Sequence, residues 1–247
     1  MRISEQLPAI IENLCKVFLD GLQDVLGDNL YGVYLFGAVA FPETTSTKDI
    51  DFHVILAGLI SEREHSGIKQ MHDRLAEDYP PLGVGMDGYY LLLADAGETS
   101  RPMSQLAPNY IDDAWALHRA HIRAGRCIVL YGPDPRQIYP AATWAELERD
   151  LLEQMQFVEE HLVIYPAYCT LNLCRLMYSF EKWDVVISKA AAAEWALGRF
   201  AQWQDIIEAA QRDYGGCASA QDEELMMSEV KGLYRFADER IRAPGGS

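Results

Sequence analysis

The stretch LFGAVAFPETTSTKDIDFHVIL, residues 35–56, decides the fold, because it puts two aspartates at the start of a strongly apolar run. YGVYLF (residues 31–36) and IDFHVIL (residues 50–56) are rich in aromatic and β-branched residues, which is typical of strands. The segment between them, PETTSTK, is polar and turn-forming. The sequence therefore predicts two consecutive strands, with Asp49 and Asp51 where the second one begins.

Acidic side chains gather at the start of this second strand. Residues two apart on a strand point to the same side, so Asp49, Asp51 and His53 are expected on one face. Neighbouring carboxylates repel each other unless a cation lies between them, and Mg²⁺ prefers such oxygen ligands. Asp87, between Gly85 and Gly88, lies in the next predicted strand and can join the pair if the two strands are neighbours. His53 is interpreted as a packed histidine rather than a ligand.

The remaining elements divide the chain into an α/β half and a helical half. The first half has predicted helices at 4–26 (with Ser4 as N-cap), 61–78 and 110–125, and predicted strands at 84–93 and 127–132. After the Pro- and Gly-rich run 132–140, only helices are predicted, at 143–165, 167–180, 188–200, 203–213 and 220–242. The run 132–140 is the predicted domain boundary.

Composition narrows the function classes. The 247 residues include 37 acidic and 21 basic ones, a net charge of −16, which argues against nucleic-acid binding. The charge favours solubility and would concentrate a cationic small substrate, and an acidic surface without a binding role stays the alternative. The five cysteines are odd in number and form no C-x-x-C pair, so buried free thiols in a reducing cytoplasm are expected. The sequence shows no signal peptide and no apolar run long enough to cross a membrane, which makes a cytoplasmic location the expectation.

The order of the first motif is similar to that of a known superfamily. A strand, Gly37, an 11-residue loop and then D-I-D resemble the nucleotidyltransferase superfamily with the DNA-polymerase-β-like fold. Asp49 and Asp51 take the place of that superfamily's paired acids, and Asp87 takes the place of its third acid.

The second half resembles a narrower family. LNLCRLMYSFEKWDVVISKAAAAEWALGRF, residues 171–200, looks like the C-terminal domain of aminoglycoside adenylyltransferases of the streptomycin/spectinomycin type. The shared pattern is carried by Leu171, Arg175, Tyr178, Ser188, Lys189, Ala192, Glu194, Trp195 and Ala196. This resemblance implies an α+β nucleotidyltransferase domain over residues 1–140, with a mixed β-sheet and flanking helices. It also implies an all-α helical bundle over residues 141–247 and a substrate site in the cleft between the two.

The activity implied by the resemblance is ATP- and Mg²⁺-dependent transfer of AMP to a hydroxyl of an aminoglycoside-like cationic acceptor, with release of pyrophosphate. Antibiotic resistance is then the implied role, in a monomer or weak dimer. The resemblance implies that Asp49, Asp51 and Asp87 hold two Mg²⁺ ions, and that Asp87 is also the general base that contacts the acceptor.

Further site residues follow from the same resemblance. Gly37, Ala38, Ser46 and Lys189 would bind the nucleotide, and Glu194 on the C-terminal domain would bind the amino groups of the acceptor. Trp183, in the polar loop EKWD, is expected to be exposed and able to stack on a sugar.

Three positions depart from the family pattern. Gly-Ser becomes Gly37-Ala38, which removes a hydroxyl that Thr44, Thr45, Ser46 or Thr47 could replace. Asp87 stands for a glutamate, and Ala190 stands for a second aspartate. Two alternatives stay open: an adenylyltransferase with another acceptor (a lincosamide, a metabolite or a protein side chain), and a catalytically silent relative that binds nucleotide or a cationic ligand.

Overall fold

The chain contains two compact units. A computed structural model describes residues 7–42, 47, 49–107 and 109–243. Residue contacts divide the chain into Met1–Ala142 and Thr143–Ser247, and each unit is described by itself below. The cleft expected between two domains stays a prediction.

The first unit is built on a mixed sheet. Within the described residues the sheet has four strands in the order β3-β2-β1-β4, namely β1 (Leu30–Phe36), β2 (Ile50–Leu56), β3 (Met86–Leu92) and β4 (Ile128–Tyr131). β1 runs antiparallel to β2 and β4, whereas β2 and β3 are parallel. All four strands were predicted, and the parallel pairing makes β2 and β3 begin at the same edge of the sheet.

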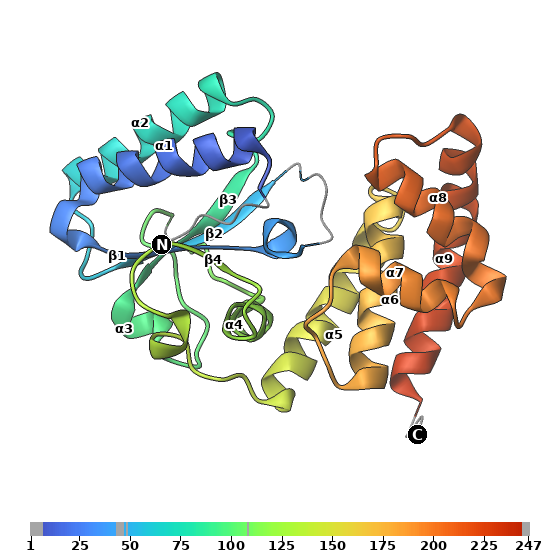
Figure 1. The fold of residues 1–247 in the computed structure, drawn as a ribbon. Coiled ribbons are helices and arrows are strands. Elements are labelled where there is room, and N and C mark those ends of the chain that lie inside the picture. Colours follow the sequence, from blue (N-terminus) through green and yellow to red (C-terminus); the bar gives the residue numbers. More distant parts are fainter. Residues whose placement is uncertain (1–6, 43–46, 48, 108, 244–247) are drawn as a thin grey trace. The chain divides into compact units, whose positions relative to one another are not determined.

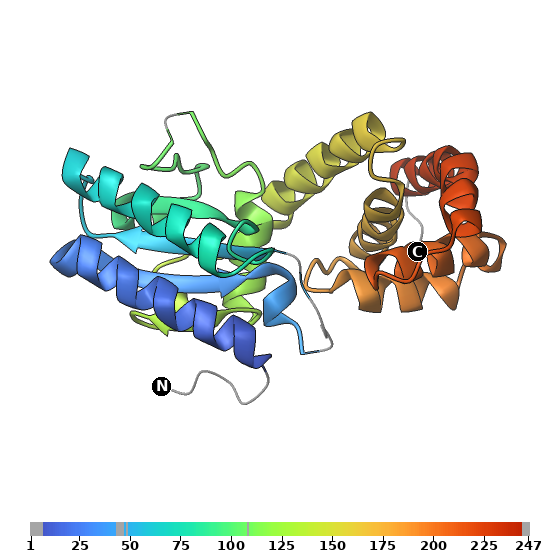
Figure 2. The same ribbon diagram turned by 90° about the horizontal axis from the view of Figure 1, so that it is seen from above.

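Helices cover both faces of the sheet (Figure 1). α1 (Ala9–Leu26) and α2 (Glu62–Asp78) lie side by side on one face, as Figure 2 shows from above, and α3 (Leu93–Ala96) and α4 (Trp115–Arg123) lie on the other. The strand side chains alternate between two cores. Ile50 and Phe52 belong to the core under α1 and α2, and Ile55 belongs to the core that contains Trp115. The alternation therefore turns Asp51 and His53 towards α3 and α4.

Three helix starts in this unit differ from the prediction. α4 begins at Trp115 rather than at residue 110, because the Asp112 side chain accepts a hydrogen bond from the Ala114 backbone N–H (3.2 Å) and so favours a turn before the helix. α1 begins at Ala9, with Pro8 at the N-cap position, rather than at residue 4, and the predicted N-cap Ser4 lies outside the described residues. α2 begins at Glu62, one residue after the predicted start, because Ser61 is its N-cap and forms a reciprocal capping box with Glu64.

The second unit is all-helical in its described part. It contains α5 (Trp144–His161), α6 (Pro166–Lys182), α7 (Lys189–Leu197), α8 (Gln204–Tyr214) and α9 (Ala220–Arg242). α6 packs against all four others, and its buried side chains include Leu173 and Cys174. The predicted helices are confirmed with ends shifted by a few residues. Among the described residues, no helix is long and apolar enough to cross a membrane.

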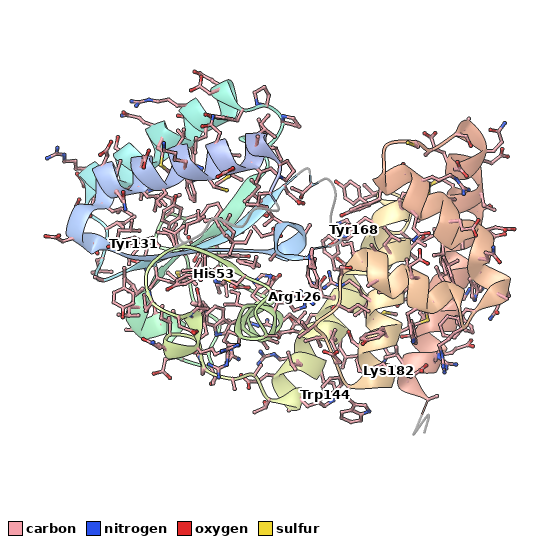
Figure 3. The ribbon with its side chains drawn as sticks, viewed as in Figure 1. His53, Arg126, Tyr131, Trp144, Tyr168 and Lys182 are labelled. Carbon is pink, nitrogen blue, oxygen red and sulfur yellow. The ribbon has the colours of Figure 1, made fainter. Side chains whose placement is uncertain are left out.

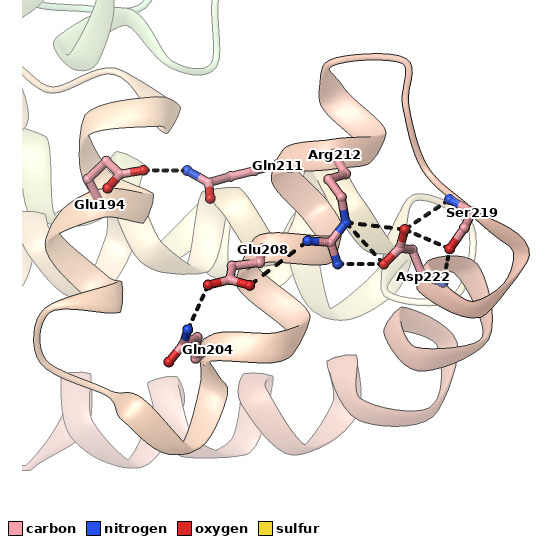
Figure 4. A network of polar contacts seen from close by, with 7 residues as sticks. All are labelled: Glu194, Gln204, Glu208, Gln211, Arg212, Ser219 and Asp222. Atoms are coloured by element: carbon pink, nitrogen blue, oxygen red, sulfur yellow. Dashed lines mark hydrogen bonds and ion pairs between the residues drawn. The ribbon is translucent and has the colours of Figure 1, made fainter.

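Polar contacts fix the start of α9 and join α8 to its neighbours (Figure 4). Ser219 and Asp222 form the capping box of α9, and Arg212 of α8 donates to Asp222 Oδ1 at 2.6 Å. The guanidinium and the Ser219 N–H and hydroxyl hold the pKa of Asp222 below its ordinary value. Gln211 donates to Glu194 Oε1 at 2.9 Å. The contact orients a carboxylate that the sequence predicted to bind a ligand.

The cysteines follow the expectation only in part. All five lie within the described residues and all are free thiols. Cys15, Cys169 and Cys174 are buried, and burial raises the pKa of Cys15 and Cys174 to about 12. Cys217, in contrast, is exposed.

Replacing Glu181 with Gln is expected to destabilise the helical unit. Glu181 forms ion pairs with Arg199 (2.8 Å), Arg240 (3.0 Å) and Lys182 (3.4 Å), and its side chain is only 17% exposed. Burial raises its pKa, but these cations outweigh burial and lower it. Because the folded pKa lies below the unfolded one, the stabilisation is present above about pH 4.3 and is lost as the pH falls through the folded pKa.

We expect Glu181→Gln to lower the free energy of unfolding by about 1–2 kcal/mol at pH 7, measured by urea titration. The difference from the wild type should shrink towards pH 3. The exposed Glu239→Gln serves as the matched control on α9. Equal effects of the two substitutions, or a difference that does not depend on pH, would show that the ion pairs contribute nothing.

Candidate functional site

Two of the predicted acids are direct neighbours in the sheet. Asp51 of β2 and Asp87 of β3 are register partners on parallel strands, so both side chains point to the α3/α4 face. Asp51 is half-buried and Asp87 is exposed. Paired positions on adjacent strands lie about 4.8 Å apart, which brings two carboxylates to one place at the start of both strands.

Asp49 lies one residue before β2 and is exposed. The Thr47 hydroxyl lies 2.7 Å from the Asp49 backbone carbonyl oxygen and 3.0 Å from Asp49 Oδ1, so it is used on Asp49 rather than left for a phosphate. Ser46, together with Thr44 and Thr45, lies outside the described residues.

The three acids are not gathered tightly. In the described part of the chain, the only three His, Cys, Asp or Glu side chains with ligand atoms within 4.8 Å of one another are found elsewhere. Carboxylates without a cation between them repel, so a looser arrangement is expected before an ion binds. The donor set itself fits Mg²⁺: three carboxylates at one sheet edge, all accessible or half-buried.

Gly37 lies directly beside the Asp51 carboxylate. Its φ of +67° is in the left-handed region, and a Cβ at this position would lie 1.7 Å from Asp51 Oδ2. The sequence predicted a glycine that lets a phosphate approach the backbone. The structure adds a second reason, since any side chain here would collide with the Asp51 carboxylate. Ala38 follows in the short 3₁₀ turn Gly37–Ala40 and is half-buried.

Tyr110 is a site residue that the sequence did not single out. Its hydroxyl donates to Asp87 Oδ1 at 3.1 Å, and its ring stacks on Tyr89 with centroids 4.8 Å apart. The stack and the hydrogen bond orient the Asp87 carboxylate. Tyr110 lies in the loop before α4, within a range predicted as helix, so no sequence signal placed it beside β3.

A buried cluster of two histidines and an aspartate lies behind the acid pair. Asp112 Oδ2 is 2.9 Å from His118 Nδ1 and 3.3 Å from His53 Nε2. His53 and Asp112 are fully buried, and 26% of the His118 side chain is exposed. Figure 3 places His53 inside the sheet unit. His53 was expected to be a packed histidine, and it is buried. Its polar partners, Asp112 and Tyr139, were not predicted.

The pKa values in the cluster shift in opposite directions. Burial lowers the pKa of His53, with Asp112 opposing it. Burial also opposes the charge on His118, but the ion pair and hydrogen bond with Asp112 outweigh burial and raise the pKa of His118. The pKa of Asp112 is lowered, because both histidines overcome the effect of its burial.

The candidate residues of the helical unit have structural partners. Lys189 Nζ donates to the Tyr214 hydroxyl at 2.8 Å and lies 4.3 Å from the centroid of the Tyr168 ring. Glu194 is exposed and accepts from Gln211. Trp183 is 69% exposed, as expected, and its ring lies 4.6 Å from that of Trp144.

Comparison with known proteins gives matches of two kinds, to a family model and to solved structures. The family model described as "Aminoglycoside adenylyltransferase, C-terminal domain" matches residues 137–240. Among solved structures, spectinomycin adenyltransferase AAD(9) from Enterococcus faecialis, determined with ATP and spectinomycin, has a TM-score of 0.73 at 14% sequence identity. The alignment covers 92% of this chain and 99% of that chain, so the fold is shared over nearly the whole length. No curated protein sequence matches.

Proposed function

We propose that the protein transfers AMP from ATP to a hydroxyl of a cationic, aminoglycoside-like acceptor, on the premise that residues 137–240 match the family model of the aminoglycoside adenylyltransferase C-terminal domain. The observation that carries the proposal is the register pair Asp51–Asp87 beside Gly37. The fold shared with an enzyme determined in complex with ATP and spectinomycin supports it.

The three carboxylates would have two roles, binding the metal ion and accepting a proton. Asp49, Asp51 and Asp87 would hold Mg²⁺, and the ion would supply positive charge to offset the charge on the α-phosphate and on the departing pyrophosphate. The acceptor hydroxyl attacks the α-phosphorus, the bond to the bridging oxygen breaks, and Asp87 accepts the hydroxyl proton. Tyr110, by donating to one Asp87 oxygen, keeps the carboxylate oriented for that transfer.

The residues proposed to bind the acceptor are chosen by their charge and exposure. A chain with net charge −16 attracts a polycation, and an exposed, oriented carboxylate such as Glu194 can bind an ammonium or guanidinium group. Trp183 offers an exposed ring for a sugar face. Lys189, held between two tyrosine rings, is the proposed phosphate contact of the helical unit.

The experiment is an assay with ATP labelled at the α-phosphate, Mg²⁺ and separate acceptors: streptomycin, spectinomycin, a lincosamide, and no acceptor. The proposal expects label on an aminoglycoside and stoichiometric pyrophosphate. Label on a lincosamide or on protein alone would assign a different acceptor, and ATP binding without any transfer would mean a silent relative.

Ala38→Ser tests the missing hydroxyl. Ala38 is half-buried directly after Gly37, and restoring a serine should add one hydrogen bond to a phosphate oxygen. One hydrogen bond contributes about 1 kcal/mol, so we expect about a fivefold lower KM for ATP with the KM for the acceptor unchanged. Ala40→Ser, in the same turn, is the control. No change in KM for ATP would mean that the phosphates lie elsewhere.

A further inference from the structure

We propose that His53, Asp112 and His118 form a second metal site, distinct from the carboxylate site and selective for a divalent transition-metal ion such as Zn²⁺. The proposal rests on three ligand atoms: His53 Nε2, Asp112 Oδ2 and His118 Nδ1. The three residues each offer one ligand atom within 4.8 Å of the others, and Asp112 Oδ2 is the atom that makes the ion-pair contacts with both histidines. Two imidazoles and one carboxylate are the donor set that zinc prefers over magnesium.

The distances fit coordination without rearrangement of the backbone. Ligand atoms about 2.0–2.1 Å from a tetrahedral ion lie about 3.3 Å from each other. The two measured separations from Asp112 Oδ2 are 2.9 Å to His118 Nδ1 and 3.3 Å to His53 Nε2. Small side-chain rotations would admit an ion, with one position left for water or a substrate atom.

His53 shows why an ion fits better than hydrogen bonds alone. Its Nε2 is 3.3 Å from the Asp112 carboxylate, yet it makes no well-aligned hydrogen bond with any described residue. The ring is fully buried, so this nitrogen has lost water without gaining a good partner. A metal ion would satisfy the nitrogen through its lone pair.

The outer contacts are those of a metal site. Metal-bound histidines donate their other ring nitrogen to a fixed acceptor, and metal-bound carboxylates accept further hydrogen bonds. His53 Nδ1 lies 3.2 Å from the Tyr139 hydroxyl, and Asp112 Oδ1 accepts from the Ala114 N–H at 3.2 Å. Aromatic rings surround the site, with the Phe36 ring in edge-on contact with His53 and in tilted contact with His118.

The position of the cluster gives the ion a role. His53 is two residues from Asp51 on the same face of β2, Asp112 lies in the loop that carries Tyr110, and His118 is on α4. An ion here would tie β2, the loop and α4 together directly behind the acid pair. Binding would therefore stabilise the first unit and fix the loop that orients Asp87.

The test is direct metal binding to full-length protein freed of metal by a chelator. Excess Mg²⁺ is added first to occupy the carboxylate site, and Zn²⁺ is then titrated by calorimetry. We expect one Zn²⁺ per chain and a higher Tm. Co²⁺ should give the strong visible absorption of a tetrahedral site with nitrogen ligands, a signature that needs no variant.

Variants separate the two metal sites. His118→Asn should weaken Zn²⁺ binding by more than about 100-fold and abolish the Co²⁺ spectrum, and Tyr139→Phe should weaken binding roughly tenfold. Asp87→Asn, and His65→Asn on the exposed surface of α2, should leave the spectrum unchanged. Absence of stoichiometric Zn²⁺ and of a tetrahedral Co²⁺ spectrum in the wild type would overturn the proposal, as would a spectrum lost with Asp87→Asn but kept with His118→Asn.

Discussion

Asp51→Asn is expected to lower AMP transfer by about 1,000-fold while leaving the fold intact. Asp51 is the half-buried member of the acid pair and the register partner of Asp87. Asparagine keeps the shape but removes the charge that holds a divalent cation. Because two neighbouring carboxylates repel, the variant should also have a Tm equal to or above that of the wild type when Mg²⁺ is absent.

The measurement is kcat and Tm, each with and without Mg²⁺. Asp73→Asn is the control, since Asp73 is exposed on α2, on the opposite side of the sheet. A variant with full turnover would remove Asp51 from the metal site. A variant that loses stability without Mg²⁺ would mean that Asp51 is structural instead.

Gly37→Ala is expected to have the second-largest effect, a loss of about 100-fold in the rate of AMP transfer. The reason is that moving the Asp51 carboxylate by about 1 Å would misplace the metal ion and the phosphates that it binds. The new Cβ would lie 1.7 Å from Asp51 Oδ2, so the carboxylate must move. The left-handed backbone adds strain of about 1–2 kcal/mol.

Gly27→Ala isolates the two effects. Gly27 also has a positive φ, +50°, but a Cβ there would meet nothing within 4 Å. We expect Gly27→Ala to lose stability with unchanged kcat and Gly37→Ala to lose both, measured by steady-state kinetics and thermal unfolding. Equal kcat in the two variants would show that Asp51 need not stay where it is.

Much of the fold could be predicted from local patterns in the sequence. The strands at 31–36 and 50–56 could be predicted because their residues suit a buried, pleated surface, and the helical second half from its periodic apolar positions. The register between β2 and β3 decides that Asp51 pairs with Asp87 and not with Met86 or Gly88. Register is set by packing on both faces of the sheet, which single-sequence patterns do not contain.

The residues behind the acids could not be predicted for a related reason. Tyr110 and Asp112 lie in a stretch whose composition suits a helix, yet the Asp112 side chain binds the backbone at Ala114 and delays the helix to Trp115. His53 and its partner Tyr139 are 86 positions apart. Only the folded sheet unit brings these residues together.

The most direct test of the acid pair is a crystal structure with Mn²⁺ and a non-hydrolysable ATP analogue, using the anomalous signal of manganese. Manganese density between the Asp51 and Asp87 carboxylates, in contact with the triphosphate, is the predicted result. Density away from both carboxylates, or an Asp87 side chain turned from Asp51 with nucleotide bound, would contradict the proposed site.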